Sequence, residues 1–251
     1  MIIKQNVNIT PFDAERTLHI YLPDDYDDSD ERYPVMYMFD GQNLFLNEDA
    51  SFGKSWGMKD ILDSWHQKFI VVGLECSHES DERLFEFCPY TSNREPWNGA
   101  PVYGQKLMKW MTGELKNMID AEFRTLPFRE TTAVGGSSMG GLMALYSVIR
   151  HNNIFSKAAC LSSATFMCMN RLFQEIRKSD LDPDTRVYLS WGSQEFPSRN
   201  SFVADVRRNL QLNHELNLKG VQTYPYLHMD GTHSEGSWEE EVPVFLDYLW
   251  G

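Results

Sequence analysis

Residues 134–141 hold the side chains of this chain that are best placed to do chemistry. They include Gly136-Ser137-Ser138-Met139-Gly140, a G-x-S-x-G pattern. An apolar, β-branched run precedes it and a helix-forming run follows it, which is the context of a nucleophile elbow, a tight turn between strand and helix. Side chains two residues before or after the serine would collide with the neighbouring strand and helix. Glycines stand at both positions around Ser138, whereas Met139 occupies one of them for Ser137, so Ser138 is the predicted nucleophile.

A serine nucleophile needs a base, and the base needs an acid that orients it. In α/β hydrolases these residues follow in the order serine, acid, histidine. Glu195 is the first carboxylate after an expected strand at 186–192, and His233 follows an expected strand at 221–227, just before a closing helix. Open α/β sheets place their sites at the carboxyl ends of the strands. We therefore predict a triad of Ser138, His233 as base and Glu195 as acid.

Three other residues compete for these roles. Asp230 is a rival acid, but it follows the wrong strand and lies too near His233 in sequence to reach its far nitrogen easily. Asp205 is a weaker rival because it falls inside an expected helix at 199–217. His228 is the competing base, although it belongs to the last expected strand. The remaining histidines have no placement that serves the serine: His19, His66, His78, His151 and His214.

The elements that must position these residues alternate between strand and helix along the chain. Apolar or alternating runs predict strands at 2–9, 16–23, 35–39, 69–74, 131–134, 156–162, 186–192 and 221–227. Helical spacing predicts helices at 57–66, 103–122, from the elbow to about residue 150, and at 168–178, 199–217 and 237–250. This order indicates an α/β fold, with a mostly parallel central sheet and helices on both faces. Residues 76–102 read as a long irregular loop, which suggests that they line a functional site.

Composition limits the classes of function. With 251 residues, 42% of them hydrophobic, the chain is long enough for one large α/β domain that covers residues 1–251. The net charge of −13 argues against nucleic acid and anionic membranes as partners. It mildly disfavours polyanionic substrates as well. The sequence leaves the oligomeric state open, a homo-oligomer included.

The cysteines and the amino-terminal segment bear on metals and on location. Cys76, Cys88, Cys160 and Cys168 form no C-x-x-C pair and no cluster with zinc-ligand spacing, so reduced, buried thiols and no metal ion are expected. The first residues lack the apolar core of a signal peptide, and no run approaches transmembrane length. The expected location is therefore cytoplasmic, although a mature domain with its signal removed would look the same.

Taken together, these motifs resemble the esterase D group of α/β hydrolases. That group includes feruloyl and acetylxylan esterases, enterochelin-type esterases, S-formylglutathione hydrolases and mycolyltransferases. The resemblance spans nearly the whole chain and rests on residues 37–45, Arg83 and Glu86 before Pro89, Arg124-Thr125, Arg129-Glu130, residues 136–142, and His233 before Trp238. It implies the α/β-hydrolase fold, with Ser138 as nucleophile, His233 as base and the acid at Glu195. Many relatives carry aspartate at the acid position, so the glutamate is a departure from the pattern.

The resemblance also implies an oxyanion hole made of two backbone amides. One belongs to the residue after the nucleophile, Met139, and the other to Gln42 by its position after the third strand. Arg83 and Glu86 are expected to form an ion pair that fixes their loop. The implied reaction is acyl transfer through an acyl-enzyme, with no metal or organic cofactor.

The substrate is predicted from aromatic residues near the expected site. They are Phe45, Phe52, Trp56, Phe85, Phe87, Tyr90, Trp97 and Tyr103. A few of them facing Ser138 would make a flat, apolar cleft suited to sugar rings or phenolic acyl groups. We expect acetyl or feruloyl esters of carbohydrates as substrates, small molecules or oligosaccharides, with Trp56 and Trp97 as substrate-binding residues. A thioester hydrolase such as an S-formylglutathione hydrolase, an acyltransferase, and a non-catalytic binding protein on the same fold stay as alternatives.

Overall fold

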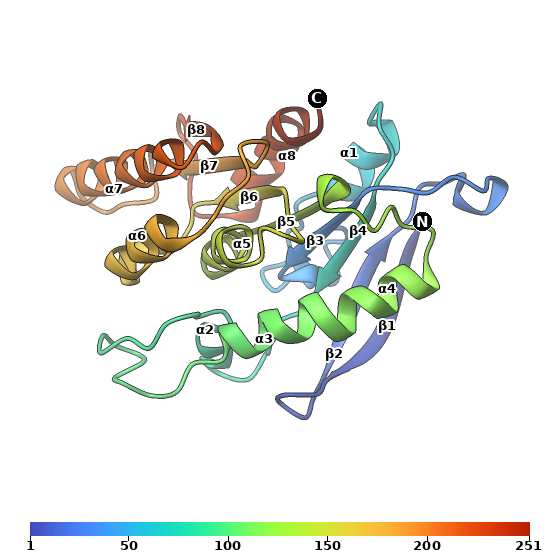
Figure 1. The fold of residues 1–251 in the computed structure, drawn as a ribbon, viewed down its shortest axis with the longest axis horizontal. Coiled ribbons are helices and arrows are strands. Elements are labelled where there is room, and N and C mark those ends of the chain that lie inside the picture. Colours follow the sequence, from blue (N-terminus) through green and yellow to red (C-terminus); the bar gives the residue numbers. More distant parts are fainter.

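The computed structural model describes residues 1–251, which form an eight-stranded sheet flanked by helices (Figure 1). The strands are β1 (Ile2–Ile9), β2 (Ala14–Tyr21), β3 (Val35–Phe39), β4 (Ile70–Leu74), β5 (Thr132–Ser137), β6 (Lys157–Leu161), β7 (Arg186–Gly192) and β8 (Gln222–His228). Their order across the sheet is β1-β2-β4-β3-β5-β6-β7-β8. The pairs β1–β2 and β2–β4 are antiparallel and all others are parallel, so the predicted mostly parallel sheet is confirmed.

Helices follow most strands. They are α1 (Met58–Ser64), α2 (Glu82–Glu86), α3 (Gly104–Trp110), α4 (Lys116–Glu122), α5 (Met139–Arg150), α6 (Met169–Lys178), α7 (Arg199–Leu218) and α8 (Glu235–Trp250). A π-helical segment, Met111–Leu115, joins α3 to α4, so the helix expected at 103–122 is one continuous helical run, seen in green in Figure 1. None of the helices is both long enough and apolar enough to cross a membrane.

Two apolar cores lie on opposite faces of the sheet. Successive side chains of a strand point to opposite faces, and β3 shows this directly. Tyr37 and Phe39 belong to the larger core with α3, α5, α6 and α7, whereas Met36 and Met38 belong to the smaller core with α1 and α8. Helices therefore cover both faces, which explains why the central strands are continuous apolar runs.

The loop expected at 76–102 is mostly irregular, but it contains the short helix α2. Several of its side chains are buried, including Phe87, Cys88 and Trp97. All four cysteines of the chain are buried and unpaired. The loop therefore packs on the larger core beside the carboxyl end of the sheet.

Candidate active site

Ser138 stands alone between β5 and α5, in a strained backbone conformation with φ 56° and ψ −117°. A non-glycine residue at positive φ is uncommon and marks a sharp turn. A methyl carbon built on Gly136 would lie 2.8 Å from the Gly140 carbonyl carbon, and one built on Gly140 would lie 2.9 Å from Cβ of Phe39. Both glycines are therefore required for the close approach of helix and strand. Ser137 is buried at the end of β5, while Ser138 is partly exposed.

Glu195 and His233 form a hydrogen-bonded pair beside this turn. Oε2 of Glu195 lies 2.9 Å from Nδ1 of His233. The glutamate follows β7 and the histidine follows β8, and these strands are neighbours in the sheet, so the two loops lie side by side. The second glutamate oxygen, Oε1, accepts hydrogen bonds from Ser162 Oγ at 2.7 Å and from the Gly192 amide. Both oxygens of the carboxylate are thus held in place.

Ser162 and Trp238 support the pair from behind. The indole N–H of Trp238 donates to Ser162 Oγ at 2.9 Å, and Ser162 in turn donates to Glu195. The Trp238 ring also lies edge-on to the His233 ring, with 5.1 Å between centroids. Burial alone would raise the pKa of Glu195, but hydrogen bonds from His233, Ser162 and the Gly192 amide outweigh it and hold that pKa below its usual value. Glu195 is therefore ionised at neutral pH, ready to orient the imidazole.

A cleft of about 450 Å³ contains Ser138, Glu195 and His233 together. Its other lining residues are Leu84, Trp97, Met139, Ser162, Ser163, Ala164, Phe166, Met167, Phe196 and Asp205. No hydrogen bond joins Ser138 Oγ to His233. Such bonds are often long in free enzymes and shorten when substrate binds. The cleft thus brings together a serine, a histidine with one free ring nitrogen, and a glutamate.

The rival base and the rival acid after β8 both face elsewhere. Nδ1 of His228 lies 3.2 Å from Glu241 Oε1, and its Nε2 lies 3.1 Å from Glu240 Oε2, so both ring nitrogens are occupied by helix α8. The Asp230 carboxylate accepts a hydrogen bond from the Gln194 side chain at 3.3 Å. Neither residue lines the cleft.

Asp205, the third rival, lies on α7 and does line the cleft. Its carboxylate is buried and accepts hydrogen bonds from Arg208 at 2.7 Å and from the Asn209 side chain at 2.9 Å. Burial raises the pKa of this carboxyl, and the bonds from Arg208 and Asn209 oppose that effect without overcoming it. Asp205 is the only carboxylate of the cleft lining apart from Glu195.

Of the two residues expected to supply amides to an oxyanion hole, Met139 lines the cleft and Gln42 does not. Met139 is the first residue of α5, so its amide has no partner within the helix, and it lines the cleft. The helix dipole favours negative charge at this end. Gln42 lies in a 3₁₀ turn, Gly41–Asn43, directly after β3. Its side chain is buried and donates to Ser51 Oγ at 3.3 Å and Cys76 Sγ at 3.2 Å.

A family model described as "Putative esterase" matches residues 10–248. The chain belongs to this esterase family. Its enzyme class is therefore that of the serine carboxylic ester hydrolases, as the motifs predict.

Individual relatives of this esterase are distant in sequence. It is 22% identical over 211 residues to the uncharacterized protein YbbA of Bacillus subtilis, which covers 82% of this chain and 80% of that one. Its structure superposes on an IroE-like serine hydrolase from Shewanella oneidensis with a TM-score of 0.78, at 19% identity, covering 99% of this chain and 79% of the other. A ferulic acid esterase gives a TM-score of 0.71 at 16% identity, covering 100% and 97%. The two structural likenesses confirm the α/β-hydrolase fold.

The two tryptophans expected to bind substrate differ in placement. Trp97 lines the cleft of this esterase, and its indole N–H donates to the Leu84 carbonyl at 3.0 Å. Trp56 is fully buried in the smaller core, where its ring packs against Trp238 with 5.7 Å between centroids. Trp56 is therefore a core residue outside the cleft lining, which corrects the sequence-based expectation. Its backbone amide donates to the Asn43 carbonyl in the turn after β3 at 2.8 Å, which holds the indole against Trp238 of α8.

The expected ion pair between Arg83 and Glu86 is not formed. Arg83 instead binds Asp40, and Glu86 pairs with Arg16 of β2 and accepts a hydrogen bond from the Ser77 amide at 2.9 Å. The two side chains leave α2 in different directions, one toward the turn after β3 and the other toward the sheet edge. Both still fix the loop, but through separate partners.

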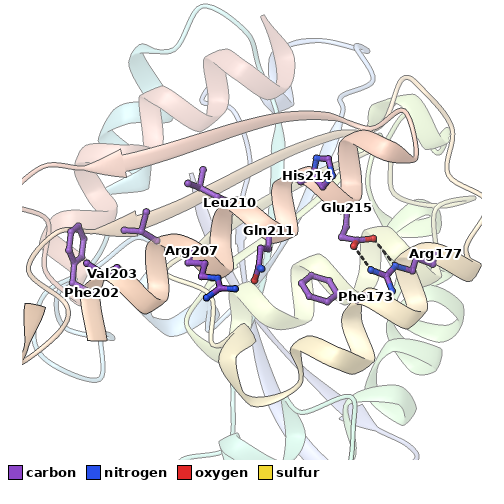
Figure 2. A pocket seen from close by; sticks show the side chains of 10 residues that line it. Phe173, Arg177, Phe202, Val203, Arg207, Leu210, Gln211, His214 and Glu215 are labelled. Atoms are coloured by element: carbon purple, nitrogen blue, oxygen red, sulfur yellow. Dashed lines mark hydrogen bonds and ion pairs between the residues drawn. The ribbon is translucent and has the colours of Figure 1, made fainter. Parts of the chain in front are cut away.

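A larger hollow lies between α6 and α7 (Figure 2). It measures about 730 Å³ and contains Phe173, Phe202 and Leu210, with an Arg177–Glu215 ion pair at one end. It contains no serine and none of the residues of the cleft described above. Cavity size alone would thus select a hollow without a serine nucleophile.

Proposed function

We propose that this protein hydrolyses carboxylic esters through a Ser138–His233–Glu195 triad and an acyl-enzyme intermediate. The observation that carries the proposal is the Glu195–His233 hydrogen bond, with Ser138 in the same cleft. The Nδ1 side of the imidazole faces the ionised glutamate, which leaves Nε2 free to accept the serine proton. This arrangement belongs to nucleophilic catalysis by an activated hydroxyl group.

The chemical steps follow from these positions. Ser138 Oγ attacks the ester carbonyl carbon while its proton moves to Nε2 of His233. The tetrahedral intermediate collapses, His233 protonates the leaving alcohol, and the acyl group stays on Ser138. Water then repeats the attack, with His233 again as base, and releases the acid. Glu195 stays ionised throughout and stabilises the imidazolium that forms.

The amides of Met139 and Gln42 supply the oxyanion hole in this proposal. Negative charge develops on the carbonyl oxygen during both attacks. Each fixed amide that points at that oxygen lowers the activation free energy by about 3 kcal/mol. The amino-terminal end of α5 adds the favourable end of the helix dipole.

For the substrate we infer acetyl or feruloyl esters of carbohydrates. The cleft wall is largely apolar and includes Trp97, Phe166 and Phe196, which suits a planar phenolic ring. Asp205 gives this wall one hydrogen-bond acceptor for a hydroxyl group. The similarity to a ferulic acid esterase also supports a feruloyl group. Of the two acyl groups, feruloyl would contact more of the aromatic wall, because it carries a phenolic ring.

A side-by-side panel of esters tests the proposal. Acetyl, butyryl and feruloyl esters of a sugar and S-formylglutathione are assayed with the parent and with Ser138→Ala. We expect the feruloyl or acetyl sugar ester to have the highest kcat/KM, and Ser138→Ala to hydrolyse none of them. Preference for S-formylglutathione would overturn the carbohydrate assignment, while faster transfer to an added alcohol than to water would identify an acyltransferase.

Substitutions of Trp97, which lines the cleft, and of Trp56, which lies in the core, give a test variant and its control. We expect Trp97→Ala to lower kcat/KM on feruloylated sugars by roughly tenfold relative to a small acetyl ester, because a stacking surface is lost. Trp56→Ala should leave that ratio unchanged and instead destabilise the fold by about 3–5 kcal/mol. Equal ratios in both variants would remove Trp97 from the substrate site.

A further inference from the structure

A partly buried ion pair holds the residue that precedes the turn with Gln42, one of the two residues proposed to supply an oxyanion amide. Arg83 on α2 donates from Nε to Oδ1 of Asp40 and from Nη2 to Oδ2, each at 2.6 Å. Asp40 is the first residue after β3, and only 5% of its side chain is exposed. Two parallel hydrogen bonds of this kind form a fork, which is the strong and geometrically specific form of an arginine–carboxylate contact. Arg83 thus fixes the position and the orientation of the Asp40 carboxylate.

Asp40 also sets the direction of the turn that carries Gln42. Its backbone has φ 59° and ψ 50°, a left-handed conformation that residues with a side chain adopt rarely. The turn Gly41–Asn43 begins directly after Asp40. The Asp40 carbonyl accepts a hydrogen bond from the Asn43 amide at 2.9 Å. A return of Asp40 to an ordinary conformation would rotate the amides of this turn. A clamp on the Asp40 side chain therefore helps to aim the Gln42 amide.

The Asp40 carboxylate lies against the nucleophile elbow as well. A methyl carbon built on Gly140 would stand 3.1 Å from Oδ2 of Asp40, and Gly140 is two residues after Ser138. An unpaired carboxylate at this point would oppose the negative charge that develops during attack. Burial of Arg83 lowers its pKa, but the Asp40 charge outweighs that effect and raises it, so the guanidinium stays charged and cancels the carboxylate.

The same segment carries part of the cleft wall. Leu84, next to Arg83 on α2, lines the cleft, and its carbonyl accepts the Trp97 indole N–H at 3.0 Å. The Arg83 guanidinium lies 5.4 Å from the centre of the Phe87 ring, which packs edge-on against Phe39 at the end of β3. Helix α2 therefore joins the turn after β3 to the wall that contacts substrate.

We propose that Arg83 is a positioning residue for the oxyanion hole, holding Asp40 in its left-handed conformation and cancelling its charge so that the Gln42 amide stays aimed at the oxyanion. The inference rests on the proposed function, in which the Gln42 and Met139 amides bind that oxygen. Because the clamp acts on the transition state more than on the bound ester, its loss affects kcat more than KM.

Arg83→Met tests the clamp against a matched control. We expect kcat on a small ester to fall about 10²-fold, similar to the loss of one oxyanion donor, with the affinity for a trifluoromethyl ketone falling in parallel. KM should stay within about threefold, since ground-state binding is untouched. The control is Arg16→Met, which removes the buried ion pair to Glu86 on the same helix and should leave kcat unchanged. The concentration of active sites is fixed in every variant by fluorophosphonate labelling of Ser138.

A double variant separates the effect of an unpaired Asp40 carboxylate on catalysis from its effect on folding. Arg83→Met with Asp40→Asn leaves no lone buried charge, and we expect it to recover about tenfold of the lost kcat, because the opposing carboxylate is gone. If Arg83→Met does not fold, the double variant decides alone: kcat at least about tenfold below the parent with unchanged KM supports the clamp. Parent-like kcat and ketone affinity in folded Arg83→Met, or in the double variant, would overturn it. A parent that neither hydrolyses esters nor labels at Ser138 overturns the proposed function instead.

Discussion

Two histidine–glutamate pairs lie near the carboxyl ends of β7 and β8, and only one of them has a free ring nitrogen and shares a cleft with Ser138. His233 meets Glu195 through Nδ1 at 2.9 Å, and its other ring nitrogen has no protein partner. His228 meets Glu241 at 3.2 Å and Glu240 at 3.1 Å, so both its nitrogens are occupied. The His233 side chain is 44% exposed, against 10% for His228. A histidine can act as a base for the serine only where one nitrogen stays free and reaches the cleft.

The pKa values of the two glutamates are shifted in opposite directions. For Glu195, hydrogen bonds from His233, Ser162 and the Gly192 amide outweigh burial and lower the pKa. For Glu241, burial outweighs its hydrogen bonds with Tyr188 and His228 and raises the pKa. One glutamate is therefore held ionised beside the cleft, while burial makes the other easier to protonate than an ordinary glutamate. The same pair of residue types thus lines the cleft in one place and packs inside the protein in the other.

The largest expected effect comes from removing one histidine or the other. We expect His233→Ala to lower kcat on a small ester by roughly 10⁶-fold, and Ser138→Ala or the double variant to be little worse, because the triad acts as a unit. His228→Gln should keep kcat per labelled active site within about threefold. Steady-state kinetics at equal concentrations of folded protein make the comparison. Equal losses in the two histidine variants would show that the pairs are not distinct in function.

The acids should rank in the same way, with a smaller effect. Glu195→Gln leaves His233 without the partner that fixes its tautomer, a change that costs about 10⁴-fold in a serine protease, and we expect at least about 10²-fold here. Glu241→Gln and Asp230→Asn should each change kcat by less than about threefold, since neither side chain contacts His233. A larger loss in Asp230→Asn than in Glu195→Gln would reassign the acid.

The smallest effect is an opposite pH dependence of stability. Glu195 has a lowered pKa, so its stabilising contribution is complete above the usual value of 4.5 and is lost as pH falls through the folded-state pKa. Glu241 has a raised pKa, so the folded protein loses stability as pH rises from 4.5 through the folded-state pKa. Relative to the parent, Glu195→Gln should become less harmful as pH falls below 4.5, and Glu241→Gln should become less harmful as pH rises above it. Urea unfolding between pH 3 and 8 measures both differences, and slopes of the same sign would contradict the assignment.

The fold and the elbow could be predicted because their signals are local. The apolar runs of β3 to β7 mark strands that are covered on both faces. The glycines around Ser138 avoid steric clashes within a single turn. The placement of Glu195 and His233 followed from chain order, since each comes after the strand that positions it. These features depend on residues near one another in sequence or on the regular order of strands.

The supporting contacts could not be predicted because they join distant segments. Trp238 and Ser162 are 76 residues apart, and Arg83 and Asp40 are 43 apart, with no periodic pattern to link them. Trp56 and Trp97 look alike in sequence, and only tertiary packing puts one in the core and the other in the cleft. Asp205 was a weak candidate because it lies inside α7, yet that helix carries it to the cleft wall.

Covalent labelling tests the central claim most directly. The parent protein is treated with a fluorophosphonate, digested, and mapped by mass spectrometry, beside Ser138→Ala and His233→Ala. We predict one adduct, on Ser138, which is absent from Ser138→Ala and forms far more slowly in His233→Ala, where the base is missing. No adduct on the parent, an adduct on Ser137, or equal labelling rates in the parent and His233→Ala would contradict Ser138 as the nucleophile activated by His233.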